Sequence, residues 1–344
     1  MNRETSILII YTGGTIGMVY NPENSSLVPF DFSHIEKEVP ELKRFGFKLD
    51  TEAFSPAVDS ANVTPETWQR IARLIEDKYN DYDGFVVLHG TDTMAYTASA
   101  ISFMLENLSK PVIFTGAQLP IGSLRTDGKE NLVTAIEIAA SRTAYGPVVP
   151  EVCVYFENRL FRGNRAKKNK AQYFNAFQSP NYPPLAETGV NIVFNSRFIR
   201  YPEAAARPFY VNYSIDSNVA ILKVFPGIQP QVVNAIINIE GLKAIVLETY
   251  GAGNACSLPW FINSLKIAID KGLIVLNVTQ CDSGHVDMGK YETSIQLEKI
   301  GVISAYDSTT EAAITKLMVL LGKCTRVEEL KHFLSLSIRG EISI

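Results

Sequence analysis

The sequence predicts an α/β fold with largely parallel sheets, because three of its features are typical of that class. Short apolar runs alternate with longer stretches of helical periodicity along the 344 residues. The apolar runs are continuous rather than alternating, as in strands that are buried on both faces. The longer stretches carry the signals that favour helix starts. Strands and helices in succession are the pattern of an α/β protein.

The candidate strands are runs rich in Val, Ile, Leu and aromatic residues. In chain order they are SILIIY (6–11), GFVVLH (84–89), PVIFTG (111–116), VCVYF (152–156), AILKVF (220–225), AIVLETY (244–250) and LIVLNVT (273–279).

The candidate helices lie between or after these strands. In the first, Thr64 is placed to cap, Pro65 suits the first helical position, and Trp68 and Ile71 share one face. The expected helices are TPETWQRIARLIEDKY (64–79), TMAYTASAISFMLENL (93–108), GKENLVTAIEIAASR (128–142), PWFINSLKIAIDKG (259–272) and STTEAAITKLMVLLG (308–322).

A segment rich in proline, asparagine and aromatic residues interrupts this rhythm between about residues 180 and 218. A shift of composition of this kind marks a domain boundary. We therefore expect an N-terminal catalytic α/β domain over 1–190, a linker over 191–217 and a smaller C-terminal α/β domain over 218–344.

Composition and charge disfavour several classes of function. A net charge of −4 gives no basic surplus for nucleic acid or for an anionic membrane surface. The first apolar run is too short to span a membrane, and no signal-peptide cleavage site follows it, so we expect a cytoplasmic protein. The four cysteines are scattered without metal-ligand spacing, so a structural zinc is not expected. A small neutral or zwitterionic ligand fits this composition better.

The turn TGGTIG follows the first candidate strand and places Thr15 among Gly13, Gly14 and Gly17. In a dinucleotide-binding turn the second glycine would stand where Thr15 is, and the Gly-Lys-Ser/Thr ending of a phosphate-binding loop is absent. The motif rules therefore disfavour a phosphate cradle. Thr15 lies just past the carboxyl end of a parallel strand, which is the edge where α/β sheets bind ligands. It is a candidate nucleophile.

A second turn has the same design, since the strand GFVVLH runs into Gly90, Thr91 and Asp92 before a helix. The two threonines, Thr15 and Thr91, are thus expected at the same edge of the sheet. Thr91, Asp92 and Thr93 are also good helix caps, and that interpretation stays open at this point.

The third segment is the basic run NRLFRGNRAKKNKA (158–171). A run of this kind is by default a solvated face. However, a threonine hydroxyl needs a base or a lowered pKa before it attacks a carbonyl, and a buried lysine–carboxylate pair can supply that. None of the histidines lies in a nucleophile-elbow motif that would compete.

Seven motifs follow one another along the chain: TGGTIG, VVLHGTDTMAYTASA, PVIFTGAQLP, LRTDGKENL, RGNRAKK, YGAGNA and TQCDSGHVDMGKY. Taken in this order, they resemble the bacterial-type L-asparaginase family, in particular its cytoplasmic type I branch. The resemblance spans nearly the whole chain. It implies two Rossmann-like domains, the larger with a mostly parallel sheet and the smaller flavodoxin-like, and the hydrolysis of L-asparagine without a metal or organic cofactor.

The resemblance assigns catalytic roles by position. Thr15 matches the threonine nucleophile, which attacks the side-chain amide carbon to form an acyl-enzyme and release ammonia. Thr91 and Asp92 match the second threonine and the aspartate of the family, and Lys168 matches the lysine that pairs with that aspartate. Thr91 would position the water that hydrolyses the acyl-enzyme, and Asp92 would also hold the substrate's amino group.

The resemblance also assigns substrate contacts and an assembly. In AVDSANVTPETW, Asp59, Ser60 and Ala61 match the loop that holds the α-carboxylate and amino group, although the secreted branch has glutamine where Ala61 stands. Asn254, in YGAGNA, matches a residue that reaches a neighbouring subunit's site. A homodimer or homotetramer with sites completed across subunits is therefore expected.

Two departures from the family pattern affect the site. The family's lid tyrosine is replaced by Leu27, and Tyr20 is the nearest substitute; the stretch from Met18 to about Pro56 has no clear regular pattern and is expected to close over substrate. At the places of the second, allosteric site of some type I members stand Lys167 and Glu248. These could pair in place of an effector, so hyperbolic kinetics are expected.

Two alternatives remain open on the sequence. An amino-acid-binding sensor would keep the pocket without needing Lys168. The amidase subunit of a tRNA-dependent amidotransferase shares these motifs but carries an extra N-terminal domain, whereas here the first strand begins by Ser6. The preference between asparagine and glutamine is a difference of one methylene, worth about 1–3 kcal/mol, and depends on packing.

Overall fold

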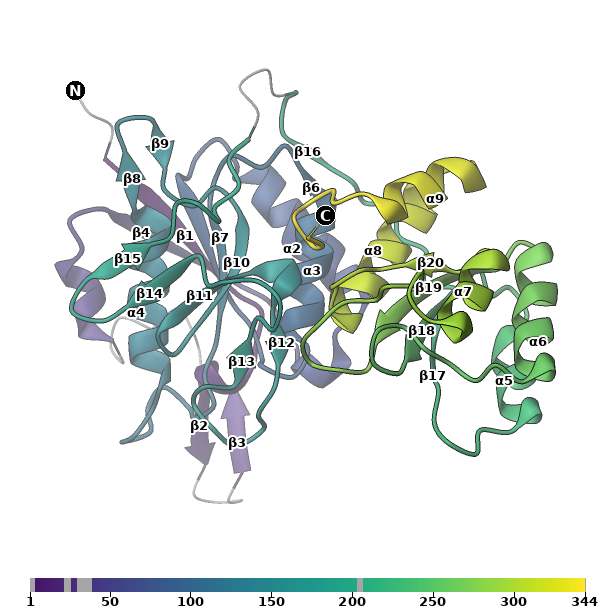
Figure 1. Ribbon diagram of the computed structural model, residues 1–344. Coiled ribbons are helices and arrows are strands. Elements are labelled where there is room, and N and C mark those ends of the chain that lie inside the picture. The colour runs from purple at the N-terminus through teal and green to yellow at the C-terminus, as the bar shows by residue number, and fades with distance from the viewer. Residues whose placement is uncertain (1–3, 22–25, 30–38, 203–206, 344) are drawn as a thin grey trace. The chain divides into compact units, whose positions relative to one another are not determined.

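The structure is a computed structural model that describes residues 4–21, 26–29, 39–202 and 207–343 (Figure 1). The chain divides into two compact units, Met1–Val211 and Asn212–Ile344. The division lies inside the segment expected as a linker, and parts of that segment form the short strands β15 (Ile192–Phe194) and β16 (Tyr210–Val211) of the larger unit. Among the described residues no helix has both the length and the apolar character needed to cross a bilayer.

The larger unit is built on an eight-stranded sheet in the order β15-β14-β11-β10-β7-β5-β1-β4. The strands from β4 to β10 pair in parallel, and β11, β14 and β15 continue antiparallel from β10. The bounds are β1 (Ser6–Tyr11), β4 (Lys48–Ala53), β5 (Gly84–Leu88), β7 (Val112–Thr115), β10 (Val152–Phe156), β11 (Arg159–Arg162) and β14 (Ala186–Thr188).

Numbered along the chain, the parallel strands have the order 2-1-3-4-5, which is that of a flavodoxin-like sheet. The continuous apolar run predicted for β1 is buried along its whole length, because both faces of the strand are covered. On one face, Ile7, Ile9, Val86 and Leu88 share a core with residues of helix α4 (Gly128–Ala140).

The helices of this unit begin near the residues that the sequence predicts. Helix α2 (Pro65–Asp77) follows Thr64, whose side chain and that of Thr67 form a reciprocal capping box. Helix α3 (Met94–Met104) is buried on nearly every side. Short elements complete the unit: β2 (Met18–Asn21), β3 (Ser26–Pro29), β6 (Leu105–Glu106), β8 (Arg142–Thr143), β9 (Gly146–Pro147), β12 (Lys167–Lys168), β13 (Phe177–Gln178) and the 3-10 helices η1 (Thr15–Gly17), η3 (Pro40–Arg44), η4 (Ser60–Asn62) and η5 (Gly163–Arg165).

The expectation that residues from Met18 to about Pro56 lack regular structure is wrong. The stretch contains the β2–β3 hairpin and η3, and β4 pairs with β1 along its whole length as an edge strand of the large sheet. The sequence KLDTEA of β4 is only partly buried and therefore lacks the apolar run by which the inner strands are recognised.

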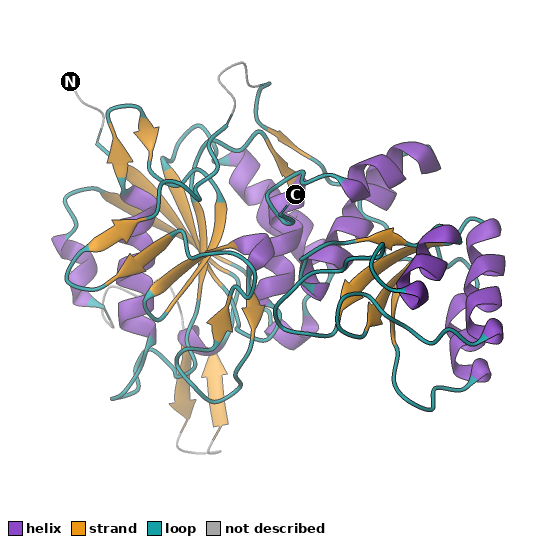
Figure 2. Cartoon of the chain, in the orientation of Figure 1, coloured by secondary structure: helices purple, strands orange, loops and turns teal. Residues whose placement is uncertain are grey.

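The smaller unit has a four-stranded parallel sheet in the sequential order β17-β18-β19-β20 (Figure 2). Helices α5, α6 and α7 share one hydrophobic core with the sheet, and α8 and α9 share a second core that uses the alternate side chains of the same strands. The bounds are β17 (Val219–Lys223), α5 (Pro230–Ile237), β18 (Ala244–Thr249), α6 (Pro259–Asp270), β19 (Ile274–Thr279), α7 (Glu292–Lys299), β20 (Ile303–Ser304), α8 (Thr310–Lys323) and α9 (Val327–Ser335).

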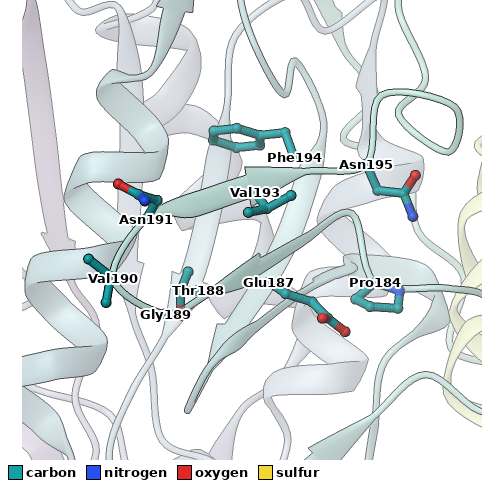
Figure 3. A pocket seen from close by; sticks show the side chains of 9 residues that line it. All are labelled: Pro184, Glu187, Thr188, Gly189, Val190, Asn191, Val193, Phe194 and Asn195. Carbon is teal, nitrogen blue, oxygen red and sulfur yellow. The ribbon is translucent and has the colours of Figure 1, made fainter.

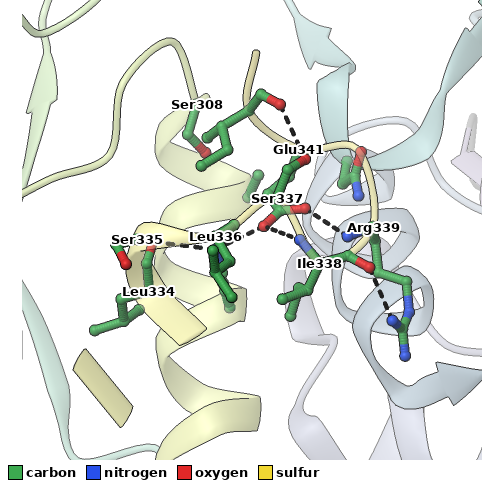
Figure 4. A network of polar contacts seen from close by, with 12 residues as sticks. Ser308, Leu334, Ser335, Leu336, Ser337, Ile338, Arg339 and Glu341 are labelled. Atoms are coloured by element: carbon green, nitrogen blue, oxygen red, sulfur yellow. Dashed lines mark hydrogen bonds and ion pairs between the residues drawn. The ribbon is translucent and has the colours of Figure 1, made fainter. Parts of the chain in front are cut away.

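The C-terminal segment of this unit is attached by a buried ion pair. Lys316 of α8 lies 2.6 Å from Glu341, and the side chains of both residues are almost inaccessible to solvent. Glu341 also accepts hydrogen bonds from the backbone amides of Ile338 and Arg339 (Figure 4). Desolvation lowers the pKa of Lys316, while Glu341 opposes that shift. The pairing fixes the segment around Glu341 against α8.

Candidate active site

The carboxyl ends of β1 and β5 lie side by side in the sheet, at the point where the strand order reverses. The chain leaves β1 toward β4 on one side and leaves β5 toward β7 on the other, which is the topological switch point where open α/β sheets bind ligands. The turn that contains Thr15 follows β1, and the turn that contains Thr91 follows β5. The 2-1-3-4-5 order therefore brings the two predicted turns together.

Glycines allow these turns to touch. Gly14 has a φ of 92°, and a Cβ atom on it would lie 2.5 Å from the Cα of Gly90. A Cβ atom on Gly13, with a φ of 137°, would overlap the carbonyl oxygen of Val58. Only glycine fits both positions, because the backbone conformation and the space exclude a side chain. Thr15, which is half-buried, and Thr91, which is buried, each follow a glycine of this contact.

Lys168 connects Thr91 with Asp92. Its Nζ donates a hydrogen bond to Thr91 Oγ1 over 2.8 Å and lies 2.7 Å from Asp92 Oδ1. Lys168 belongs to β12, where it pairs with Phe177 of β13. The lysine side chain is 19% exposed and the aspartate side chain 65%, so the pair lies at an opening to solvent.

The middle of the basic run, residues 160–166, is buried rather than solvated. Arg162, Asn164 and Arg165 are almost completely buried. Arg162 is held by Glu151 at 2.6 Å, and its guanidinium lies over the ring of Tyr182. For this part of the segment the default interpretation from charge alone is therefore wrong, because a buried carboxylate and an aromatic ring compensate the charge of Arg162.

Gln118, in the turn after β7, is a second hydrogen-bond partner of Thr91. Its Oε1 accepts a hydrogen bond from Thr91 Oγ1 over 3.1 Å, and its Nε2 donates to the carbonyl oxygens of Ala171 and Tyr173. Sequence reasoning did not assign Gln118 a role. The signal that finds it is its place in PVIFTGAQLP, just past the carboxyl end of the next parallel strand.

The loop predicted to bind substrate lies against the same glycines. Ser60 is buried at the start of η4, and a Cβ atom on Gly90 would lie 2.5 Å from Ser60 Oγ. Asp59 Oδ1 accepts a hydrogen bond from the amide of Ala61 over 2.9 Å, at the solvent side of the loop. The structure thus brings Ser60 to the crevice and keeps Asp59 and Ala61 nearer to solvent.

Other predicted residues are not brought to this crevice by the described contacts. Tyr20 pairs with Leu27 across the β2–β3 hairpin, and the role predicted for its side chain lies outside what the structure describes. Asn254 belongs to the smaller unit, where its Oδ1 accepts a hydrogen bond from Thr293. Glu248 also lies in the smaller unit and contacts Thr310 and Lys223 there; the predicted pairing with Lys167 stays a prediction.

His89 is buried next to the crevice but is uncharged at neutral pH. Its Nδ1 donates to the carbonyl of Gly90 over 2.7 Å, and its Nε2 lies 3.0 Å from Thr97 Oγ1. Trp68 donates to the same Thr97 oxygen, so the Thr97 hydroxyl can donate to Nε2. Burial lowers the pKa of His89 to about 4.

The larger unit has a separate cavity away from the predicted site residues. A cavity of about 700 Å³ lies against the β14–β15 hairpin, and none of the predicted site residues lines it (Figure 3). It is lined by Pro184, Glu187, Thr188, Gly189, Val190, Asn191, Val193, Phe194 and Asn195. In the described part of the chain, no group of three or more His, Cys, Asp or Glu residues is arranged to hold a metal ion.

The fold and the crevice define a two-unit α/β protein with paired threonines, a lysine and a carboxylate at the switch point of its larger sheet. The chain belongs to the asparaginase family. The family model "Asparaginase, N-terminal" matches residues 6–200, and "Glutaminase/Asparaginase C-terminal domain" matches residues 218–334.

Relatives of known name cover almost the whole chain. L-asparaginase 1 of Escherichia coli is 42% identical over 99% of both chains. The crystal structure of L-asparaginase I from Vibrio cholerae is 41% identical, with a TM-score of 0.89 over 99% of this chain and 100% of that one. The L-asparaginase structure from Thermococcus kodakarensis is 32% identical, with a TM-score of 0.89 over 98% and 99%.

A relative with another name shares the same region. It is a glutamyl-tRNA(Gln) amidotransferase component of Pyrococcus abyssi, 33% identical over 98% of this chain and 76% of the relative.

The predicted α/β class, with a larger and a smaller parallel sheet, is confirmed by the asparaginase matches and by the observed strand pairing.

Proposed function

We propose that this protein hydrolyses L-asparagine to L-aspartate and ammonia through an acyl-enzyme on Thr15. The observation that carries the proposal is the position of Lys168 Nζ, 2.8 Å from Thr91 Oγ1 and 2.7 Å from Asp92 Oδ1, at the switch point that Thr15 also borders. The names of the relatives, L-asparaginase 1 and L-asparaginase I, supply the substrate.

In the first step the Thr15 hydroxyl oxygen attacks the side-chain amide carbon of asparagine. The C–N bond breaks as the C–O bond forms, and the hydroxyl proton passes to the departing nitrogen, which leaves as ammonia. Negative charge develops on the amide oxygen in the transition state. Backbone amides around Gly14 and of Thr91 or Asp92 are the donors we assign to that charge.

In the second step water attacks the acyl carbon, the ester bond to Thr15 Oγ1 breaks, and the threonine oxygen takes up a proton from the water as L-aspartate leaves. We assign Thr91 to orient this water. The pair formed by Lys168 and Asp92 holds the Thr91 hydroxyl and exchanges protons with it. The hydrogen bonds support this role, since the Thr91 oxygen accepts from Lys168 while its hydroxyl donates to Gln118. The carboxylate of Asp92, mostly exposed, is also suited to hold the ammonium group of the substrate.

Substrate binding and assembly complete the proposal. Asp59, Ser60 and the backbone at Ala61 hold the α-carboxylate and amino group, with Tyr20 as the candidate lid residue. Asn254 of a second copy completes the site in a homodimer or homotetramer. We place the protein in the cytoplasm. We also expect the rate to depend hyperbolically on asparagine concentration, because the Glu248 carboxylate is already engaged by Thr310 and Lys223.

The test is ammonia release from L-asparagine and L-glutamine by the wild type and by Thr15→Ala. We expect turnover of asparagine by the wild type and its loss in the variant, with the fold retained by circular dichroism. If the wild type binds asparagine but releases no ammonia, the hydrolase assignment fails and an amino-acid sensor is the better interpretation. Asparagine binding that survives Lys168→Ala while ammonia release is lost would support the catalytic role of that lysine.

A further inference from the structure

Thr93 is the N-cap residue of α3, but its side chain makes no capping hydrogen bond to that helix. Its hydroxyl instead donates to the carbonyl oxygen of Ser60 over 2.7 Å. Threonine is a favoured N-cap because its oxygen can accept from the first turn of the helix. At this position the hydroxyl connects two loops of the crevice.

The loop that receives this bond is also attached on its other side. Before Ser60, the amide of Val58 donates to the carbonyl of Thr12 over 2.7 Å, which joins the loop to the turn after β1. The Asp59 carboxylate bonds within the loop, to the amide of Ala61. The bond from Thr93 therefore attaches the loop to the turn that contains Thr91 and Asp92.

The hydroxyl of Ser60 depends on this attachment for its position. Ser60 Oγ lies against Gly90, where a Cβ atom would be only 2.5 Å away. A shift of the Ser60 backbone would move that hydroxyl out of the crevice or into Gly90. The carbonyl of Ser60 also accepts a long 3.4 Å bond from the amide of Val63, which is a weaker restraint than the bond from Thr93.

We propose that Thr93 is a positioning residue for substrate binding, which fixes Ser60 relative to Asp92. The inference rests on the proposed function, since Ser60 and Asp92 are assigned there to the α-carboxylate and the ammonium group of the substrate. Thr93 does not contact the reacting amide. Its loss therefore weakens binding of the amino-acid end and leaves the chemical steps nearly unchanged.

The experiment compares Thr93→Val, which is nearly isosteric but lacks the hydroxyl, with Thr93→Ser, which keeps it. Thr97→Val is the matched control, because it removes a hydroxyl from the same helix one turn later, where the partners are Trp68 and His89. For each protein we measure kcat and KM for L-asparagine, the inhibition constant of L-aspartate, and the thermal midpoint.

Thr93→Val is expected to raise KM and the inhibition constant together by about threefold to tenfold, the worth of one neutral hydrogen bond, with kcat changed less than about twofold. Thr93→Ser is expected to restore both constants. Thr97→Val is expected to lower the thermal midpoint without changing KM. A purely structural role of Thr93 would instead lower the thermal midpoint and leave both constants unchanged.

The proposal is overturned if Thr93→Val leaves KM and the inhibition constant at the wild-type values, or if Thr93→Ser does not restore them. A failure of the proposed function is distinguishable, because the wild type would then release no ammonia. In that case calorimetric binding of L-asparagine to the folded wild type and to Thr93→Val still decides the role of Thr93.

Discussion

The ammonium group of Lys168 donates a 2.8 Å hydrogen bond to the hydroxyl of Thr91, although the two residues are 77 positions apart in the chain. The geometry defines which group donates and which accepts in the hydrogen bonds of Thr91. An ammonium group donates only, so the Thr91 oxygen accepts from it and the Thr91 hydrogen is directed to Gln118. Thr91 is thus held from two sides with its oxygen facing a cation. This arrangement suits a hydroxyl that must orient a reacting water.

Replacing the lysine by Lys168→Met removes the charge and keeps an unbranched side chain. Because proton handling by a positioned side chain contributes about 10²–10⁴-fold, we expect kcat to fall by at least about 100-fold, with a smaller change in KM. Steady-state ammonia release measures both. Lys170→Met is the control, since Lys170 is in the same hairpin loop and its ammonium lies 5.4 Å from the centre of the Tyr173 ring. A Lys168→Met enzyme that keeps half of the wild-type kcat would contradict the role.

Gln118 links Thr91 to the loop after Lys168, and its two ends can be tested separately. Gln118→Met removes both sets of hydrogen bonds, and we expect kcat to fall by about tenfold, the loss of one or two neutral hydrogen bonds near the reacting groups. Gln118→Glu keeps an acceptor for Thr91 but sets a carboxylate against the carbonyls of Ala171 and Tyr173.

The glutamate variant gives a pH-dependent signature. A protonated carboxyl can donate to one of those carbonyls, so activity relative to the wild type should recover as the pH falls toward about 4, near the usual pKa of glutamate. Leu119→Ala, a change at the exposed neighbour, is the control. A relative activity of Gln118→Glu that does not vary with pH would argue against the donor role of Gln118.

Much of the large sheet can be predicted because its inner strands are buried on both faces. The run SILIIY is fully buried in β1, and such runs stand out in any sequence. Edge strand β4 does not stand out, because a strand with one side open to solvent carries charged residues such as Lys48 and Asp50. Helices α5, α7 and α9 escape prediction for a related reason, since they are short and bury few residues.

The position of a site residue can be predicted where the residue directly follows a strand. It cannot be predicted where a contact between distant segments decides which side chain enters the site. Thr15 and Thr91 are found from their glycine turns, since parallel strands end at one edge. The contact of Lys168 with Asp92 follows from the family resemblance, because nothing in a basic run tells which of its charges points inward. Gln118 lies in the motif PVIFTGAQLP just past β7, which places it at this edge, but only the folded hairpin brings Ala171 and Tyr173 to it.

The contact between Gly14 and Gly90 makes a prediction about stability. Gly14→Ala places a Cβ atom 2.5 Å from Gly90 on a residue whose φ is 92°. We expect the free energy of unfolding to fall by about 1–3 kcal/mol or more, because the cost of the strained conformation and the cost of the overlap add to each other. Gly46→Ala is the control, since among the described residues no heavy atom outside its chain neighbours lies within 4 Å of its Cβ position. Thermal and urea unfolding measure the difference, and equal stability of the two variants would refute the close packing of these turns.

The buried histidine makes a prediction about pH. Burial lowers the pKa of His89 to about 4 in the folded protein, whereas an unfolded histidine titrates near about 6.5. Between these values the unfolded state binds more protons, so this group destabilises the fold as the pH falls from about 6.5 to 4. The full effect, on the order of 3 kcal/mol, is reached only below the folded pKa.

His89→Gln removes the titrating group while an amide remains to donate to the Gly90 carbonyl. We expect the variant to be less stable than the wild type at pH 7, because the side chain fits the Trp68–Thr97 arrangement less well. Its stability should, however, fall less steeply than that of the wild type between about pH 6.5 and 4. Urea unfolding across this range measures both slopes. The exposed His332, replaced by glutamine in a separate variant, controls for the loss of a histidine as such, and parallel slopes for all three proteins would show that His89 does not titrate differently on unfolding.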